Sequence, residues 1–221
     1  LIQHLPSLSE EHQENVWELV KTWADAGASD ADKAFVREKI RVTVMSRRGA
    51  KRSKKSNSLS LSATAKATYK ALEPSDLLNR HEWLFRQHWV EESADETHDD
   101  EMDYRKRDER IANLRTDALR EIFEARGFVG ILDFIEMGKA ASAIGWLMAA
   151  RILQEKDIPG FLLAALPPRS SSEFWARKDL IIGALRALPE KVRVEALQKV
   201  KSELPQADFA RLLLLSPFRR S

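Results

Sequence analysis

The sequence predicts an all-α protein built of stacked helical hairpins, with about ten helices judged from its apolar periodicity. Gly and Pro are both infrequent, at 8 residues each, and β-branched residues are scarce beside Ala, Leu, Arg, Glu and Lys. This composition favours helix over sheet. Apolar side chains recur with the period of a helix, and no segment alternates cleanly over the length of a strand. Gly or Pro stands at many of the boundaries between these segments, where helices begin or end.

The first two predicted helices form a hairpin. Ser9 begins one helix, Gly27 ends it, and Ser29 or Asp30 caps the next. Acidic residues in the first turn suit the dipole of the first helix. The apolar residues at helical spacing are Val16, Leu19, Val20 and Trp23 in the first helix, and Ala34, Phe35, Ile40, Val44 and Met45 in the second.

Residues 47–58 are predicted to form a basic loop, because the apolar periodicity stops there. One interpretation is a segment that contacts phosphates and displaces condensed counterions from nucleic acid. The other, which we favour, is a solvated connector, since no aromatic residue is interleaved to stack on bases. The candidate nucleic-acid-binding residues are Arg47, Arg48, Lys51, Arg52, Lys54 and Lys55.

Two further helices are predicted before the middle of the chain. Residues 61–72 form a short helix that ends before Pro74. Ser75 caps the next helix, which continues to Val90. Its apolar residues lie along two lines, so we expect it to be buried on two sides.

Two groups of residues in this part resemble metal sites without meeting their requirements. His81 and His88 are seven residues apart, whereas a zinc-binding helix of the HExxH type places its histidines four apart. We therefore favour interior histidines over a metal site at His81, His88 and Glu92. The acidic segment 91–103 lacks the alternating ligands and central Gly of a calcium loop, and we expect an exposed acidic linker there.

The second half of the chain predicts helices with breaks at Gly and Pro. Residues 104–126 form a charged amphipathic helix that ends before Gly127, and residues 128–136 form a short apolar one. The nearly all-apolar helix 139–156 is expected to be the most buried, with Trp146 in the interior. The remaining predicted helices are residues 161–166, one capped by Ser172, one beginning at Pro189 and one beginning at Pro205.

These helices follow one another in two-helix units of about thirty to forty residues, the period of helical repeats. The related pieces Gly130-Ile131-Leu132 and Gly160-Phe161-Leu162 fit that period. In this respect the segment from Tyr104 to Leu215 resembles α-solenoids of the HEAT or tetratricopeptide kind. It lacks the tetratricopeptide pattern W-x2-L-G-x2-Y, so the resemblance carries over no binding residues. It implies a scaffold or partner-binding arm with a long groove.

Composition excludes several classes of function. The chain has no cysteine, which excludes disulfides and cysteine-based metal or nucleophile sites. Its 36 basic and 34 acidic residues give a net charge of +2, so any attraction to nucleic acid must be local. No apolar run approaches the roughly 20 residues of a membrane span, and no secretory signal opens the chain. Phosphate-binding Gly-rich loops and paired Ser, His and Asp nucleophile arrangements are lacking. We therefore expect a cytoplasmic protein with no catalytic residues, no metal and no cofactor, and no contact with membranes.

The sequence predicts two helical subdomains, residues 1–102 and 103–221. Because the chain opens at Leu1 and ends just after a helix, we expect it to be a segment of a larger bacterial-type protein. The leading hypothesis is a non-catalytic interaction or scaffold segment that binds a protein partner or neighbouring domains. The alternative is a nucleic-acid-binding module using the basic loop, with weak binding at most. The third, a metal-dependent enzyme fragment using the carboxylates of 91–103, is the least favoured.

Overall fold

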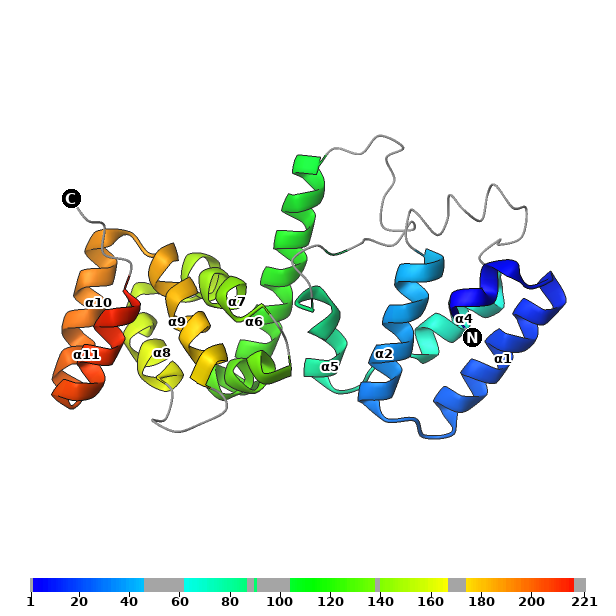
Figure 1. The fold of residues 1–221 in the computed structure, drawn as a ribbon, viewed down its shortest axis with the longest axis horizontal. Coiled ribbons are helices and arrows are strands. Elements are labelled where there is room, and N and C mark those ends of the chain that lie inside the picture. The colour runs from blue at the N-terminus through cyan, green and yellow to red at the C-terminus, as the bar shows by residue number, and fades with distance from the viewer. Residues whose placement is uncertain are drawn as a thin grey trace. The chain divides into compact units, whose positions relative to one another are not determined.

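The fold is all-α, as the sequence predicted. The structure is a computed structural model that describes residues 2–45, 62–86, 90, 104–137, 140–166 and 174–216. These residues form ten α-helices, joined by short 3-10 and π-helical segments, and they contain no strand (Figure 1).

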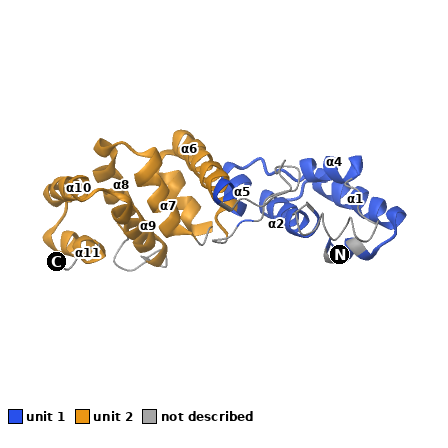
Figure 2. Ribbon diagram, turned by 90° about the horizontal axis from the view of Figure 1, so that it is seen from above, with its two compact units in different colours: residues 1–83, 89–107 blue, residues 84–88, 108–221 orange. Residues whose placement is uncertain are grey.

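The chain divides into two compact units (Figure 2). Unit 1 comprises residues 1–83 and 89–107, and unit 2 comprises residues 84–88 and 108–221. The predicted subdomain boundary between residues 102 and 103 lies outside the described residues.

Unit 1 contains short helices around one apolar core. Its elements are the 3-10 helix η1 (Ile2–Ser7), α1 (Glu10–Asp25), α2 (Asp30–Ile40), the π-helix η2 (Arg41–Met45), α4 (Ala63–Ala71) and α5 (Leu77–His81).

Four helices of unit 1 begin at a side-chain cap, in which an oxygen accepts a hydrogen bond from a backbone N–H three residues later. Ser9 and Ser29 cap α1 and α2, which confirms the predicted starts. Asp76 rather than Ser75 caps α5. The fourth cap, for α4, is Ser62.

Gly27 occupies the turn after α1. Its φ of 95° is a backbone conformation that favours glycine.

Trp17 of α1 lies in the core of unit 1 and is only 2% exposed. The hydroxyl of buried Thr68 in α4 donates to the Trp17 carbonyl oxygen over 3.2 Å, which ties the two helices together. Buried polar groups need such partners because an unmade hydrogen bond costs free energy. The other buried residues of this core are Leu5, Ala24, Ile40, Val44, Ala65 and Leu72.

The prediction of one helix from Ser75 to Val90 is wrong beyond His81, where α5 ends. After α5 a 3-10 turn, η3 (Glu82–Leu84), follows, and Phe85 is not helical. Phe85 instead belongs to unit 2, where its ring packs edge-to-face on Phe134 at 5.2 Å between centroids. Arg115 also donates from Nε to the Leu84 carbonyl oxygen over 2.8 Å. These tertiary contacts hold the segment in a non-helical conformation that periodicity alone does not reveal.

The long helix α6, which belongs to unit 2 from Asp108 onward, bends at a glycine. Gly127 has φ of 61° and ψ of −153° inside α6 (Tyr104–Met137), which confirms the predicted break. The ring of Phe128 lies 5.2 Å from that of Phe123 and 5.7 Å from that of Phe161, so aromatic contacts surround the bend. The later elements are α7 (Ala141–Leu147), the π-helix η5 (Met148–Ile152), the 3-10 helix η6 (Glu155–Asp157), α8 (Ile158–Ala165), α9 (Phe174–Ala187), α10 (Glu190–Glu203) and α11 (Gln206–Leu215).

Helices α7 and α9 cross through two glycines. A Cβ atom added to Gly145 would lie 1.9 Å from the carbonyl oxygen of Leu180, and one added to Gly183 would lie 2.0 Å from that of Ser142. Each helix therefore presents a glycine to the backbone of the other. This close approach buries both glycines and most of the apolar residues around them.

The expectation that Trp146 lies in the interior is wrong, because its side chain is 43% exposed. Successive residues in an α-helix are about 100° apart around the axis. Gly145 faces α9, so the side chain of the next residue points away from that contact. The buried residues of α7 are Ala141, Ile144, Gly145 and Leu147.

Candidate interaction surface

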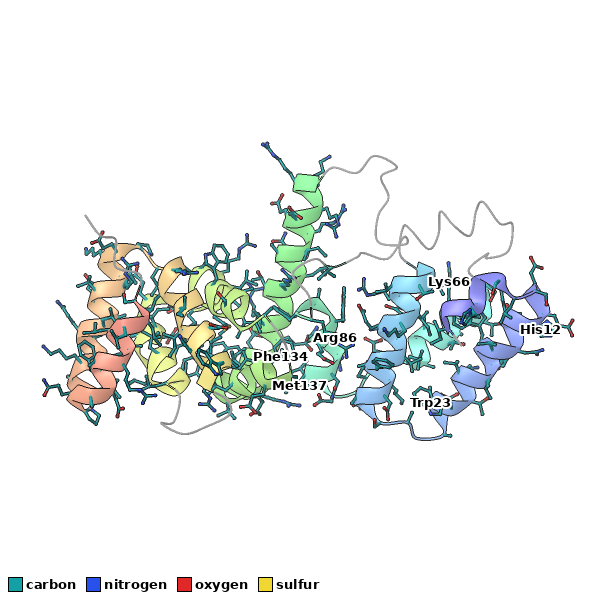
Figure 3. All side chains as sticks on the ribbon, in the orientation of Figure 1. His12, Trp23, Lys66, Arg86, Phe134 and Met137 are labelled. Atoms are coloured by element: carbon teal, nitrogen blue, oxygen red, sulfur yellow. The ribbon has the colours of Figure 1, made fainter. Side chains whose placement is uncertain are left out.

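The most distinctive exposed surface of unit 1 is on α1. Leu19 is 63% exposed and Trp23 is 39% exposed, although both belong to the apolar pattern that predicted the helix. The two residues are one helical turn apart, so they lie on the same side of α1. We call the surface formed by His12, Leu19 and Trp23 the outer face of α1; Figure 3 labels His12 and Trp23 at opposite ends of the helix.

The apolar pattern of α1 is divided between the core and this outer face. Trp17 and Ala24 are buried, while Val16 and Val20 are partly buried and pack against the same core. The apolar arc of the helix is wider than the surface that the core covers. Leu19 and Trp23 occupy its uncovered edge.

A third stripe of α1 is acidic. Glu11, Glu14, Glu18 and Asp25 recur at spacings of three, four and seven residues, which places them along one side of the helix. With Glu10, the helix carries five carboxylates against one lysine, Lys21. Among the described residues, no cation forms an ion pair with Glu10, Glu11, Glu18 or Asp25.

Glu14 is the member of the acidic stripe with neighbours in another helix. The hydroxyl of Ser62, and secondarily that of Thr64, donates a hydrogen bond to its carboxylate and holds the pKa of Glu14 below its ordinary value. These two hydroxyl groups therefore favour the ionised form of the Glu14 carboxylate.

At the start of the outer face, the imidazole Nδ1 of His12 lies 2.5 Å from the Ser9 hydroxyl oxygen. The same hydroxyl caps α1 by accepting from the His12 backbone N–H. The pair belongs to the first turn of the helix, and its geometry is that of a cap.

Two other exposed aromatic rings are each covered in part by a lysine of their own helix. The Lys178 ammonium lies 4.7 Å from the ring centroid of Trp175, and that of Lys39 lies 5.4 Å from the ring of Phe35. In such a cation–π contact, the cation lies over one face of the aromatic ring and is attracted to it. Within the described residues, no cation lies over Trp23. Its ring is available to an external group.

Unit 2 contains an open cleft of about 380 Å³ between the segment 154–159 and α10. Pro159 and Ala196 contribute its buried apolar lining. Two exposed carboxylates, Glu155 and Glu195, and two exposed ammonium groups line its sides. The ammonium groups are those of Lys156 and Lys199.

The structure does not test the sites that the sequence singled out. All six cations of the basic loop lie outside the described residues, as do the acidic segment 91–103, His88 and Glu92. His81 is described and is half-buried at the end of α5. In the part of the chain that the structure describes, no group of three His, Cys, Asp or Glu side chains could hold a metal ion. The same residues include no helix that is long and apolar enough to cross a membrane.

Sequence reasoning found Leu19 and Trp23 but did not recognise them as surface residues. A signal was present, because apolar residues at positions 16, 17, 19, 20, 23 and 24 cover more of the helix circumference than one neighbouring helix can bury. Comparisons with known protein families, with curated proteins and with solved structures found no match to this chain.

Proposed function

We propose that this protein is a non-catalytic interaction module, and that the outer face of α1 binds a partner protein. One observation carries the proposal: a leucine and a tryptophan one turn apart are exposed on a helix whose other apolar residues are buried or partly buried against the core. Single exposed apolar residues are common on protein surfaces. Two large ones side by side, with no cation over the ring, provide a patch that a partner can cover.

The energetics of binding favour such a pair as an anchor. Burial of apolar surface contributes about 25 cal/mol per Å², and tryptophan is enriched among the residues that dominate protein interfaces. Because α1 is held by the Trp17 core and by its cap, the outer face is already in its final conformation. Little conformational entropy is then lost when a partner binds.

The experiment uses the absence of cysteine from the chain. In the variant Leu19→Cys, the single thiol is labelled with a photoactivatable benzophenone, and the protein is irradiated in an extract of its native cells. Lys70→Cys, at an exposed position of α4, is the matched control. We expect a discrete cross-linked protein from position 19 that is missing from position 70, and whose yield falls when Trp23→Ala is added. Identical products from both positions would contradict the proposal.

A further inference from the structure

We propose that the partner segment bound by the outer face of α1 is a basic amphipathic helix. This inference rests on the proposed function and specifies the chemistry of the partner. It follows from the arrangement of the apolar and acidic stripes on one helix.

The exposed side of α1 presents two kinds of surface next to each other. Leu19 and Trp23 form the apolar edge, and the acidic stripe runs parallel to it. Only the small polar side chains of Asn15 and Thr22 separate the two stripes on the helix surface. A partner that lies along α1 therefore meets apolar and negatively charged groups at the same time.

A helix with apolar residues at positions i and i+4 matches the one-turn spacing of Leu19 and Trp23. Lysine or arginine residues beside that apolar stripe would reach across Asn15 and Thr22, because their long aliphatic stems lie along a surface while the charged end extends. Their natural acceptors are the carboxylates of Glu11 and Glu18. Both are exposed, and neither has an ion-pair partner among the described residues.

The same charges disfavour other occupants. Five carboxylates on α1 would repel the phosphates of nucleic acid or of an anionic membrane surface. A second copy of the chain that packed α1 against its own α1 would bring two acidic stripes together, since a two-fold interface pairs identical surfaces. Charge complementarity thus selects a cationic apolar segment.

The test measures the anisotropy of a fluorescein-labelled peptide helix made of Leu and Lys, with the full chain as the titrant. A second peptide, in which every Lys is replaced by Glu, has the same apolar stripe and opposite charge. We expect the Lys peptide to bind and the Glu peptide to bind at least about tenfold more weakly. Affinity for the Lys peptide should fall as salt is added, because exposed charges are screened.

Three variants locate the binding. Leu19→Ala with Trp23→Ala, and separately Glu11→Gln with Glu18→Gln, should each weaken the Lys peptide about tenfold, the difference that 1.4 kcal/mol makes. Trp175→Ala removes a more exposed tryptophan, 66% exposed, from unit 2 and should leave binding unchanged. Far-ultraviolet circular dichroism checks that every variant keeps its helices.

Several outcomes would overturn the inference. The first is equal binding of both peptides, and the second is binding that Trp175→Ala weakens as much as the α1 variants do. The third is a dimer seen by sedimentation that Trp23→Ala dissociates, because a second copy would then occupy the surface. If cross-linking from position 19 still captures a partner while the Lys peptide does not bind, the interaction function stands and the basic class of partner is wrong.

Discussion

Helix α1 of unit 1 and the α7–α9 pair of unit 2 use their apolar residues in different ways. In α7 and α9, glycines bring the two backbones together, and most of the apolar residues around the crossing are buried. In α1, bulky side chains fill the core on one side, and two more remain in solvent. Both patterns have the same helical period.

The difference shows that two helices with the same apolar period can be covered by their neighbours to different extents. Small residues let helices approach closely, so a narrow contact buries much of each helix. In α1, the apolar residues span a wider arc of the helix than the core covers, and Leu19 and Trp23 at the edge of that arc are left exposed.

The largest expected effect is the difference in stability between alanine variants of the two tryptophans of α1. Trp17→Ala removes a fully buried ring and should lower the free energy of unfolding by about 3–5 kcal/mol. Trp23→Ala, on the outer face, should change it by no more than about 0.5 kcal/mol. Chemical unfolding followed by circular dichroism measures both. Equal losses would mean that Trp23 is part of the core.

The glycine crossing predicts the next largest effect. Gly145→Ala places a methyl group where the Leu180 carbonyl oxygen lies, so the helices must separate, at a cost of about 1–3 kcal/mol or more. The matched control is Gly160→Ala in α8, where the nearest atom to the new methyl would be 3.6 Å away. That substitution should stabilise the helix by about 0.5–1 kcal/mol, because alanine favours helix over glycine. Thermal unfolding of the two variants gives opposite shifts if the crossing is as described.

The bend in α6 gives a third prediction. Gly127→Ala introduces a side chain at φ of 61° and ψ of −153°, a region that only glycine adopts readily. We expect a loss of about 1–3 kcal/mol even though no neighbouring atom lies within 4 Å of the new Cβ. Gly127→Asn should cost a similar amount, since the strain is in the backbone. A neutral result for both would show that α6 straightens at this position.

The smallest effect concerns the acidic start of α2. The Ser75 hydroxyl donates to Asp30 Oδ2 over 2.7 Å, and this bond, with the Asp76 backbone N–H, lowers the pKa of Asp30. A carboxylate with a lowered folded-state pKa adds stability above its unfolded value, about 3.9, and loses it as the pH falls through the folded value. Asp30→Asn should therefore flatten the decline in stability of unit 1 below about pH 4. Unfolding midpoints measured from pH 2 to pH 7 would show the change, and an unchanged slope would contradict it.

The all-α class and several helix ends could be predicted because their signals are local. Ser9 and Ser29 cap helices through bonds to N–H groups three residues away, and Gly27 and Gly127 adopt conformations that other residues avoid. Pro189 and Pro205 precede helices because proline has no N–H to satisfy. Each of these signals depends on a few neighbouring residues, so the sequence was sufficient to find it.

The candidate site was decided by contacts between distant parts of the chain. The apolar pattern placed Leu19 and Trp23 on one helix and did not single out Trp17. Only the packing of α4, whose Thr68 donates to the Trp17 carbonyl oxygen, shows that Trp17 is covered while the other two are exposed. Likewise, Gly145 turns Trp146 outward because it faces the backbone of Leu180, thirty-five positions later in the chain. The sequence alone determined that these segments are helical, since helix formation is local. Which side of each helix meets solvent depended on the neighbouring helices and the size of the residues between them, and only the tertiary structure contains that information.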